Sequence, residues 1–378
     1  MPRRSEARFI RTAPDSISFE RGLMSAQTPI VSVVMPCRNE IHGIEATMAS
    51  VLDQEAPEGD FEIIVVDGMS DDGTREVLDR VAGLDARVRV VDNPERITPC
   101  AMNAGIGVAR GRYIAIMGAH NRYAPDYLIR CLELAERTSA DNVGGAVFAE
   151  AAGYLERAVA ASHHSWFSVG GSHWHDTLRE GPAESVWGGF YRREVFDRIG
   201  LFDESLVRNQ DDELNLRLVR AGGVIWQSPT IRSWYQARGS LRALFKQYRQ
   251  YGYWKVRVIR KHRLPASARH LVPAGFLALV ITQLLAAVAL QLLAIGNPRL
   301  AAPALVVSLS LIGVLVAYAA AGFVAAVTTA TAQGWDLLPV LPVVFPLYHL
   351  GYGLGFIAGL RDAALARRAP NWAGELTR

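Results

Sequence analysis

Acidic and amide side chains directly follow three stretches of the chain whose residue pattern is that of buried β-strands. These loops are residues 37–40, 67–74 and 92–96, and the second carries Asp67, two further aspartates and two glycines. Glycine and aspartate favour tight turns with exposed backbone N–H groups, which can bind a phosphate or a ribose. One such loop could be ordinary polar surface, but three together predict a binding edge for phosphate or ribose.

A second group of chemically capable residues is the carboxylate cluster Asp211, Asp212 and Glu213. Clustered carboxylates repel one another, which raises the proton affinity of at least one member and makes a general base near neutral pH. The cluster also opens a helix predicted over residues 211–221, with Leu214, Leu218 and Val219 facing inward. The other interpretation is therefore ordinary negative charge at a helix N-terminus.

The elements that must position these residues alternate between strand-like and helix-like patterns. Strands are predicted over residues 30–35, 61–66, 88–91, 113–117 and 143–148. Helices are predicted over 44–52, 74–81, 99–109 with Thr98 as N-cap, and 125–137. Such alternation predicts an α/β fold whose parallel sheet is covered on both faces and binds ligands beyond the carboxyl ends of its strands.

Charge and hydropathy divide the chain further. Residues 1–237 hold 25 basic and 34 acidic side chains, whereas residues 238–270 hold ten basic side chains and no acidic one. Residues 271–360 contain only two charged side chains, Arg299 and Asp336. This distribution excludes a purely soluble protein and a disordered one. A basic segment before an apolar block fits the anionic cytoplasmic leaflet better than it fits a nucleic acid.

Several ordered motifs resemble those of a known enzyme family. They read SVVMPCRNE, IIVVDGMSDDGT, NAGIGVARGRYIAIM and GGFYRREVFDRIGLFDESLVRNQDDELNLRL. Over roughly residues 29–263 the chain resembles family 2 inverting glycosyltransferases with the GT-A fold, which has a Rossmann-like, mostly parallel sheet. It is similar to the membrane-anchored enzymes of succinoglycan and exopolysaccharide synthesis. The resemblance implies transfer of a sugar from a nucleotide diphosphate sugar, expected to be UDP-linked, to an acceptor hydroxyl.

The resemblance also implies roles for single residues. Asp211 falls at the position of the general base, with Asp212 and Glu213 as alternatives. The residues expected to bind the nucleotide-sugar donor are Pro36, Arg38, Glu40, Asp67, Asp92 and Arg96.

The metal-binding triplet departs from the family pattern. Relatives carry Asp-x-Asp or Asp-x-His after the fourth strand, which binds Mg²⁺ or Mn²⁺, but this chain has Gly118-Ala119-His120. Hard divalent ions prefer oxygen ligands, so His120 alone predicts a weak metal site. Three possibilities stay open. His120 binds the metal with diphosphate oxygens and water, Arg122 or Arg192 replaces part of its charge, or catalysis is impaired.

Acceptor residues are expected in two places. Residues 162–190 are rich in glycine, tryptophan and histidine, which predicts a flexible acceptor loop rather than a zinc site. Further along, a basic amphipathic helix carries a loose match to a Gln-x-x-Arg-Trp motif. The residues that the resemblance assigns to acceptor or sugar binding are Gly188, Gly189, Tyr191, Gln247, Arg249 and Trp254.

The apolar blocks 271–295, 300–332 and 337–360 could each span a bilayer of about 30 Å. Three crossings would place the C-terminal arginines outside, against the positive-inside trend, and the prolines of the third block favour a kinked or re-entrant segment. Two or three crossings therefore stay open. The expected parts are a flexible extension (1–28), the GT-A domain (29–237), a basic interfacial segment (238–270), the transmembrane region (271–360) and a tail (361–378).

Together these patterns predict an enzyme of the inner membrane with its catalytic domain in the cytoplasm. Its expected partners are a nucleotide sugar, a polyprenyl-diphosphate-linked glycan and membrane lipid, with no role for nucleic acid. The alternative is a catalytically impaired nucleotide-sugar-binding subunit of a polysaccharide assembly, because Gly118 replaces the usual metal-binding aspartate.

Overall fold

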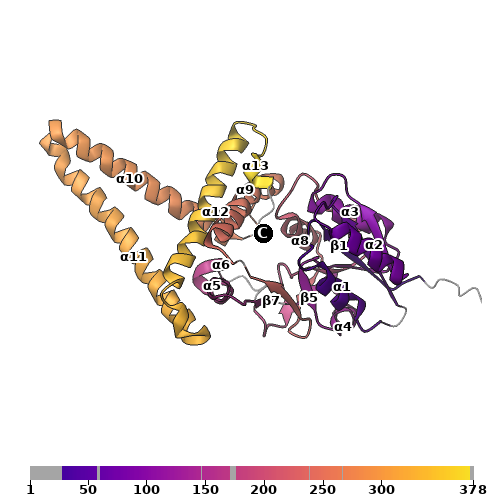
Figure 1. Ribbon diagram of the computed structural model, residues 1–378. Coiled ribbons are helices and arrows are strands. Elements are labelled where there is room, and N and C mark those ends of the chain that lie inside the picture. The colour runs from indigo at the N-terminus through magenta and orange to yellow at the C-terminus, as the bar shows by residue number, and fades with distance from the viewer. Residues whose placement is uncertain are drawn as a thin grey trace, which may run out of the picture.

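The structure is a computed structural model that describes residues 28–57, 60–145, 147–170, 176–237, 239–265 and 267–374. Apart from residue 28, the predicted N-terminal extension lies outside the described residues. The chain forms an α/β domain and a set of helices, two of which extend far from that domain (Figure 1). The expected order of an α/β domain followed by apolar helices is confirmed.

An eight-stranded sheet with the order β3-β2-β1-β4-β9-β6-β10-β8 forms the centre of the α/β domain. The first four strands in this order are parallel, whereas β9 runs antiparallel to both of its neighbours. A second sheet has the order β5-β11-β7. The strands are β1 (Val31–Cys37), β2 (Phe61–Asp67), β3 (Val88–Asp92), β4 (Tyr113–Ile116), β5 (Asn121–Tyr123), β6 (Asn142–Gly144), β7 (Val147–Glu150), β8 (Gly181–Pro182), β9 (Phe190–Arg192), β10 (Ile225–Gln227) and β11 (Ser233–Gln236).

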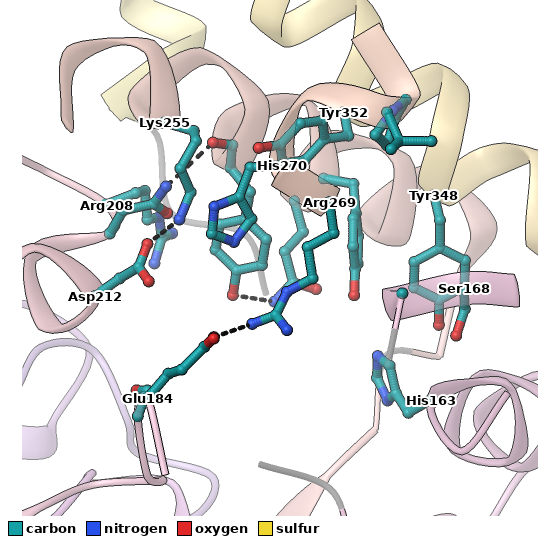
Figure 2. A pocket seen from close by; sticks show the side chains of 18 of the residues that line it. His163, Ser168, Glu184, Arg208, Asp212, Lys255, Arg269, His270, Tyr348 and Tyr352 are labelled. Atoms are coloured by element: carbon teal, nitrogen blue, oxygen red, sulfur yellow. Dashed lines mark hydrogen bonds and ion pairs between the residues drawn. The ribbon is translucent and has the colours of Figure 1, made fainter. Parts of the chain in front are cut away.

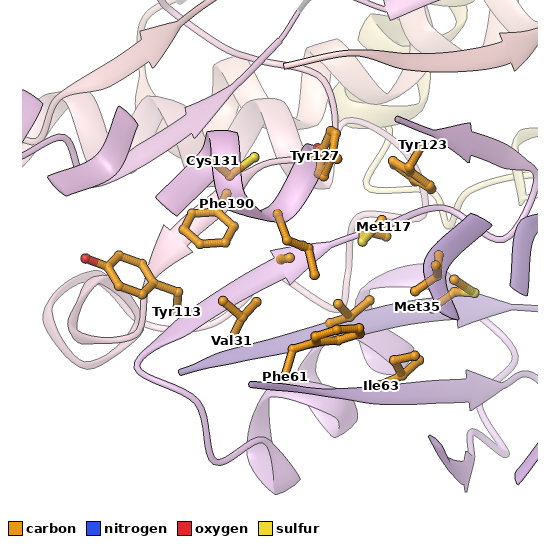
Figure 3. Close-up of a cluster of buried hydrophobic side chains, with 14 of the residues drawn as sticks. Val31, Met35, Phe61, Ile63, Tyr113, Met117, Tyr123, Tyr127, Cys131 and Phe190 are labelled. Atoms are coloured by element: carbon orange, nitrogen blue, oxygen red, sulfur yellow. The ribbon is translucent and has the colours of Figure 1, made fainter. Parts of the chain in front are cut away.

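Helices cover both faces of the eight-stranded sheet. On β1 the side chains of Val31, Val33 and Met35 enter one core and Val34 enters the other, as the period of two requires. Figure 3 shows Val31 and Met35 in the first of these cores. The first core is closed by α1 (Ile44–Leu52), α2 (Thr74–Leu84) and α4 (Tyr127–Thr138). The second is closed by α3 (Thr98–Val108), α7 (Glu194–Ile199) and α8 (Gln210–Arg220).

Three local predictions were wrong. The strand predicted over 143–148 is two strands in different sheets, because a Cβ on Gly145 would overlap the carbonyl oxygen of Ile231, and the chain changes sheets at this close approach. Thr98 is the first residue of α3 and not its N-cap, a position taken by Ile97. Val219 on α8 is 46% exposed, while Leu214 and Leu218 are buried as expected.

The remaining helices lie outside the two sheets and include the long apolar ones. Three segments, Ala268–Gly296, Pro298–Gln333 and Leu341–Ala364, are long and apolar enough to cross a bilayer. Two of them contain the hairpin of α10 and α11, which extends away from the α/β domain (Figure 1). The helices are α5 (Tyr154–His163), α6 (Trp166–Val169), α9 (Leu241–His262), α10 (Val272–Gly296), α11 (Ala301–Gln333), α12 (Leu341–Ala364) and α13 (Asn371–Gly374).

The basic amphipathic helix expected at the membrane surface is α9, and it packs closely against α12 (Figure 1). Glycines make this possible, because a Cβ on Gly252 would overlap the carbonyl oxygen of Tyr352, and one on Gly355 that of Arg249. Small residues spaced four apart allow helix backbones to approach closely in this way. Most of the proline-rich third block, from Leu341 onward, forms the continuous helix α12, which contains Pro346.

Candidate functional site

The three polar loops predicted to converge do meet at one edge of the sheet. Cys37 at the end of β1 pairs in register with Asp67 at the end of β2, and Asp67 pairs with Asp92 at the end of β3. Because these strands are parallel, the loops that follow them leave from the same edge. The carboxyl edge of the sheet is thus built from consecutive parts of the chain.

Asp67 is the buried centre of this edge. Its carboxylate accepts hydrogen bonds from the hydroxyl of Ser70 (2.6 Å) and from the backbone N–H of Ser70 (3.2 Å). The guanidinium of Arg75 lies 3.5 Å from Asp67 and bonds Asp92 (2.5 Å). Sequence reasoning missed Arg75, although its place in the first turn of α2, directly after the loop, could have suggested it.

The first and second loops are tied together by side chains. The amide of Asn39 donates to Asp71 and accepts from the backbone N–H of Asp71, at 2.9 and 3.0 Å. The side chain of Arg38 packs over Gly68 and donates to the carbonyl oxygen of Arg96 (3.4 Å), so Arg38 and Arg96 lie together as expected. Pro36 lies within β1, one residue before the end of that strand.

The triplet after β4, Gly118-Ala119-His120, lacks the carboxylate that a metal site would need. A Cβ on Gly118 would lie 2.9 Å from the side-chain nitrogen of Asn121, so this amide fills the space that an aspartate would need. His120 Nδ1 lies 3.2 Å from Glu40 Oε1. Among the described residues no three His, Cys, Asp or Glu side chains are grouped to hold a metal ion. The residues present therefore do not fit a metal site built by the protein.

The two arginines considered as substitutes for the metal charge are engaged elsewhere. Arg122 forms an ion pair with Glu150 and lies over the ring of Trp234. Arg192 donates to two carbonyl oxygens, that of Ala135 in α4 and that of Ala140 just after this helix.

The three carboxylates at the start of α8 have different environments. Glu213 is buried and bonds Arg217, Lys261 and His262, which lower its pKa despite burial. Burial would raise the pKa of Asp212, but its ion pair with Lys255 outweighs this and lowers that pKa. Both are therefore poor bases, since they hold their protons weakly.

Asp211 differs from its two neighbours. Its carboxylate is open to a cavity, and no basic side chain among the described residues forms an ion pair with it. The protein atoms around it and the adjacent charge of Asp212 raise the pKa of Asp211 above the ordinary value of 3.8. A carboxylate that faces open space and binds a proton more tightly than usual is suited to general base catalysis.

The cavity beside Asp211 has a volume of about 830 Å³ and lies between the α/β domain and the helices α9 to α12 (Figure 2). One wall belongs to the α/β domain and includes residues 184–187 and 209–212. The opposite wall comes from α9, from the turn before α10 and from α10, α11 and α12. It includes Lys255, Arg269, Phe276, Tyr318, Tyr348 and Tyr352.

Two glycines connect the cavity wall to the edge of the sheet. Gly188 and Gly189 follow Trp187, which lines the cavity, and both have positive φ (73° and 106°). The carbonyl oxygen of Gly189 accepts from the N–H of Ile116 at the end of β4 (2.9 Å). Tyr191 is buried, and its hydroxyl donates to Asn215 on α8 (3.2 Å).

The three residues of the Gln-x-x-Arg-Trp match have separate surroundings. Gln247 lines the cavity and donates to the hydroxyl of Tyr251 (2.9 Å). The guanidinium of Arg249 lies 3.9 Å from the centre of the Trp372 ring, and the indole of Trp254 donates to the carbonyl oxygen of Ala373 (2.8 Å). Arg249 and Trp254 therefore hold the C-terminal segment around α13 against α9, which no local pattern could have predicted.

The loop predicted over 162–190 contributes to the cavity at both of its ends. His163 and Trp166 line it from one side, and Trp187 from the other. His163 Nδ1 bonds the hydroxyl of Tyr235 at 3.0 Å. The central residues 171–175, which carry two of the histidines in the predicted loop, lie outside the described residues.

Comparison with known proteins agrees with the resemblance seen in the sequence. The family model for glycosyl transferase family 2 matches residues 32–200. The succinoglycan biosynthesis protein ExoA of Rhizobium meliloti (strain 1021) is 36% identical over 234 residues, which cover 61% of this chain and 70% of ExoA. A dolichyl N-acetyl-alpha-D-glucosaminyl phosphate 3-beta-D-2,3-diacetamido-2,3-dideoxy-beta-D-glucuronosyltransferase of Methanococcus voltae is 28% identical over 240 residues, 61% of this chain and 74% of its own length.

Among solved structures, the mannosyltransferase PcManGT from Pyrobaculum calidifontis, in complex with GDP-Man and Mn²⁺, is similar with a TM-score of 0.52. The match covers 88% of each chain at 19% identity, so it concerns the fold. Together with the α/β domain and the apolar helices described above, these similarities establish that the chain belongs to glycosyltransferase family 2 and is a glycosyltransferase with the GT-A fold.

Proposed function

We propose that this enzyme transfers a sugar from a nucleotide diphosphate sugar, UDP-linked, to a glycan carried on a polyprenyl diphosphate, in exopolysaccharide or cell-surface glycan synthesis. The observation that carries the proposal is the cavity of about 830 Å³, which has the α8 carboxylates on one side and helices of the apolar segment on the other. A soluble acceptor would need no such connection between a catalytic carboxylate and the membrane.

The chemistry of the cavity changes along its length. Near α8 it carries charged side chains, whereas its far end is lined by aromatic residues from the apolar helices. There the ring of Phe276 stacks on that of Tyr318 with centroids 4.7 Å apart, and the hydroxyl of Tyr318 bonds His349 at 2.7 Å. Apolar and aromatic walls favour a hydrocarbon chain, and the charged end favours a diphosphate and a sugar.

The donor would bind at the carboxyl edge of the sheet, where Asp67, Asp92 and Arg38 lie together. In the transfer, Asp211 takes the proton of the acceptor hydroxyl while the oxygen of that hydroxyl attacks the anomeric carbon of the donor sugar. The bond from that carbon to the diphosphate oxygen breaks, and the electron pair leaves with the nucleoside diphosphate. A single displacement of this kind inverts the anomeric carbon. The raised pKa of Asp211 supports this role.

The α10–α11 hairpin begins and ends beside segments that do not belong to the apolar helices, which supports two crossings of the membrane. Before α10, Arg269 bonds Glu184 at 2.6 Å. After α11, the carbonyl oxygen of Asp336 accepts from the hydroxyl of Tyr154 on α5 at 2.7 Å. A helix of 25 residues such as α10 measures about 37 Å at about 1.5 Å per residue, enough for a hydrocarbon core of about 30 Å.

In contrast, α12 has both of its ends beside helices that do not belong to the apolar segments, α5 and α9. Near its start, Phe345 packs in one cluster with Val159 of α5, and at its end the carbonyl oxygen of Ala363 accepts from Arg260 of α9 (3.2 Å). We therefore propose that α12 lies along the membrane surface and does not cross. The C-terminal arginines then join the basic segment on the cytoplasmic side of the inner membrane, as the positive-inside trend favours.

Reporter fusions test this orientation. A reporter active only outside the cytoplasm, inserted at Asn297 between α10 and α11, should be active, whereas the same reporter at the C-terminus should be silent. An active C-terminal fusion would instead support three crossings.

Enzyme activity is tested with membranes that contain the full chain, a radiolabelled UDP-sugar and a polyprenyl-diphosphate-linked glycan. We expect label in the lipid fraction, and none with Asp211→Asn. Transfer to soluble sugars alone would refute the lipid acceptor. Nucleotide-sugar binding without turnover would favour the second candidate, a silent binding subunit, which the absence of a ligand at Gly118 motivates.

A further inference from the structure

Two cationic side chains, Lys255 and Arg269, and one imidazole, His270, which can act as a hydrogen-bond donor, gather on one wall of the cavity (Figure 2). Lys255 comes from α9, and Arg269 and His270 come from the short 3-10 turn Ala268–Leu271 that precedes α10. They are close enough that all three act on the charge of Asp212. Two segments separated by a turn of the chain thus contribute to a single cationic cluster, defined here as Lys255, Arg269 and His270.

The partners of the cationic cluster leave it able to bind a further anion. Glu184, which bonds Arg269, is 62% exposed, and an ion pair with so exposed a partner contributes little to stability. Arg269 can exchange this carboxylate for a phosphate, whose geometry the guanidinium matches with two parallel hydrogen bonds. His270 Nδ1 is buried and has no hydrogen-bond partner among the described residues.

Lys255 is the most enclosed member, with a side chain only 8% exposed. An ammonium group so deeply placed costs free energy unless an anion compensates for it. Asp212 supplies one anion. Because both side chains line the cavity, Lys255 can also contact an anion bound there.

The cationic cluster lies between the polar and the apolar parts of the cavity. Arg269 precedes Val272, where the apolar helix α10 begins, so it lies at the boundary between the polar and the apolar parts of the structure. On the polar side the cavity wall includes Asp211, and on the apolar side it includes Phe276. In a bilayer, the phosphate groups of the lipids lie between the hydrocarbon core and water.

We propose that Lys255, Arg269 and His270 form the binding site for the diphosphate of the lipid-linked acceptor. The site holds the acceptor so that its polyprenyl chain leaves among α10, α11 and α12 while its glycan reaches Asp211. This inference rests on the proposed function, because it names the residues of this chain that bind the acceptor. The donor diphosphate is the other possible source of phosphate. However, no residue of the donor loops 37–40, 67–74 and 92–96 is among the described residues that line the cavity.

The test compares Arg269→Gln with Arg269→Lys in the purified full chain. A matched control is Arg242→Gln, an exposed arginine of the same basic segment that is not among the described residues lining the cavity. Kinetics with a varied polyprenyl-diphosphate glycan should show a KM for the acceptor raised about tenfold or more in Arg269→Gln, and partly restored in Arg269→Lys. The KM for the donor should stay unchanged, and Arg242→Gln should match the unaltered enzyme.

A binding assay with a fluorescent polyprenyl diphosphate that carries no sugar separates this inference from the proposed function. Weaker binding by Arg269→Gln supports the cluster even if no acceptor glycan is ever turned over. An unchanged acceptor KM in an active Arg269→Gln enzyme would overturn the inference and leave the proposed function intact. A raised donor KM with normal lipid binding would overturn it as well, because the cluster would then bind the donor. Phosphatidylglycerol is then added as a competitor in the binding assay. If it removes the difference in binding between Arg269→Gln and the unaltered enzyme, the site binds membrane headgroups, and the inference is overturned.

Discussion

The donor edge and the acceptor cavity are constructed in different ways. The donor edge comes from residues 36–96, in three consecutive strand and loop units whose side chains bond one another, as Asn39 does with Asp71. The cavity collects residues from His163 to Tyr352, and more than four helices contribute to its wall. One half of the site is local in the sequence, and the other depends on long-range packing.

This difference separates the consequences of mutation. Changes in the donor loops should alter donor affinity and leave the acceptor side intact. Changes where helices meet should alter acceptor binding and the stability of the helical part. Asp211 lies where the two halves join, so its loss should affect turnover without affecting either affinity.

The largest effect is expected from Asp211→Asn. When the Asp211 carboxylate is absent, no base takes the proton of the acceptor hydroxyl, and kcat should fall by about 10² to 10⁴. Donor affinity, measured by calorimetry, should stay as it is. Glu213→Gln is not a suitable control, because Glu213 is buried in an ion-pair network. A near-normal kcat in Asp211→Asn would show that another residue is the general base.

The packing of α9 against α12 should be the next most sensitive feature. Gly355→Leu would place a side chain against the backbone of Arg249, at a cost of about 1–3 kcal/mol or more. Thermal unfolding of the purified full chain should begin at a lower temperature. Gly313→Leu on α11 is the control, since no heavy atom lies within 4 Å of a Cβ there. Equal stability of the two variants would contradict the close packing.

Asp67→Asn probes the donor edge alone. If this carboxylate binds the nucleotide, its loss should remove a charged hydrogen bond of about 1.5–3 kcal/mol and weaken donor binding about 10- to 100-fold. Asp79→Asn is matched, because Asp79 also pairs with Arg75 but is 56% exposed on α2. A change in acceptor KM rather than in donor affinity would contradict the assignment of the donor to the sheet edge and the acceptor to the cavity.

A smaller shift is expected in the pH profile. Asp211 must be deprotonated to act, so its raised pKa places the acid limb of kcat/KM above pH 3.8. Asp212→Asn removes a negative charge that raises this pKa, so the limb should move to lower pH. A shift to higher pH, or none, would argue that Asp211 is not the titrating group.

The smallest effect concerns the metal. Gly118→Asp combined with Asn121→Ser provides both a carboxylate and the space for it. Binding of Mn²⁺ in the presence of UDP, followed by electron paramagnetic resonance, should be tighter in this double variant than in the unaltered chain. Equally tight binding in both would show that position 118 does not contact the metal.

The sequence allowed prediction of most of the donor edge but little of the cavity. Asp67 and Asp92 end strands whose patterns are evident, and parallel strands bring their ends together whatever the details of packing. Arg269 was predicted to lie in the basic interfacial segment and Phe276 in a membrane span. Only the packing of α9, α10 and α12 places both residues in the same cavity as Asp211. Arg249 and Trp254 were assigned to acceptor binding from the motif resemblance alone. Their contacts with the C-terminal segment join residues more than a hundred positions apart, which a local pattern cannot predict.

The most direct test of a single site with two differently built halves is an experimental structure of the full chain with UDP and a polyprenyl-diphosphate glycan bound. The nucleotide should lie against Asp67 at the carboxyl edge of the sheet, and the lipid diphosphate should lie in the cavity. The acceptor hydroxyl should then be about 2.6–3.2 Å from the carboxylate of Asp211. Nucleotide density inside the cavity, or an acceptor hydroxyl out of reach of Asp211, would contradict the account.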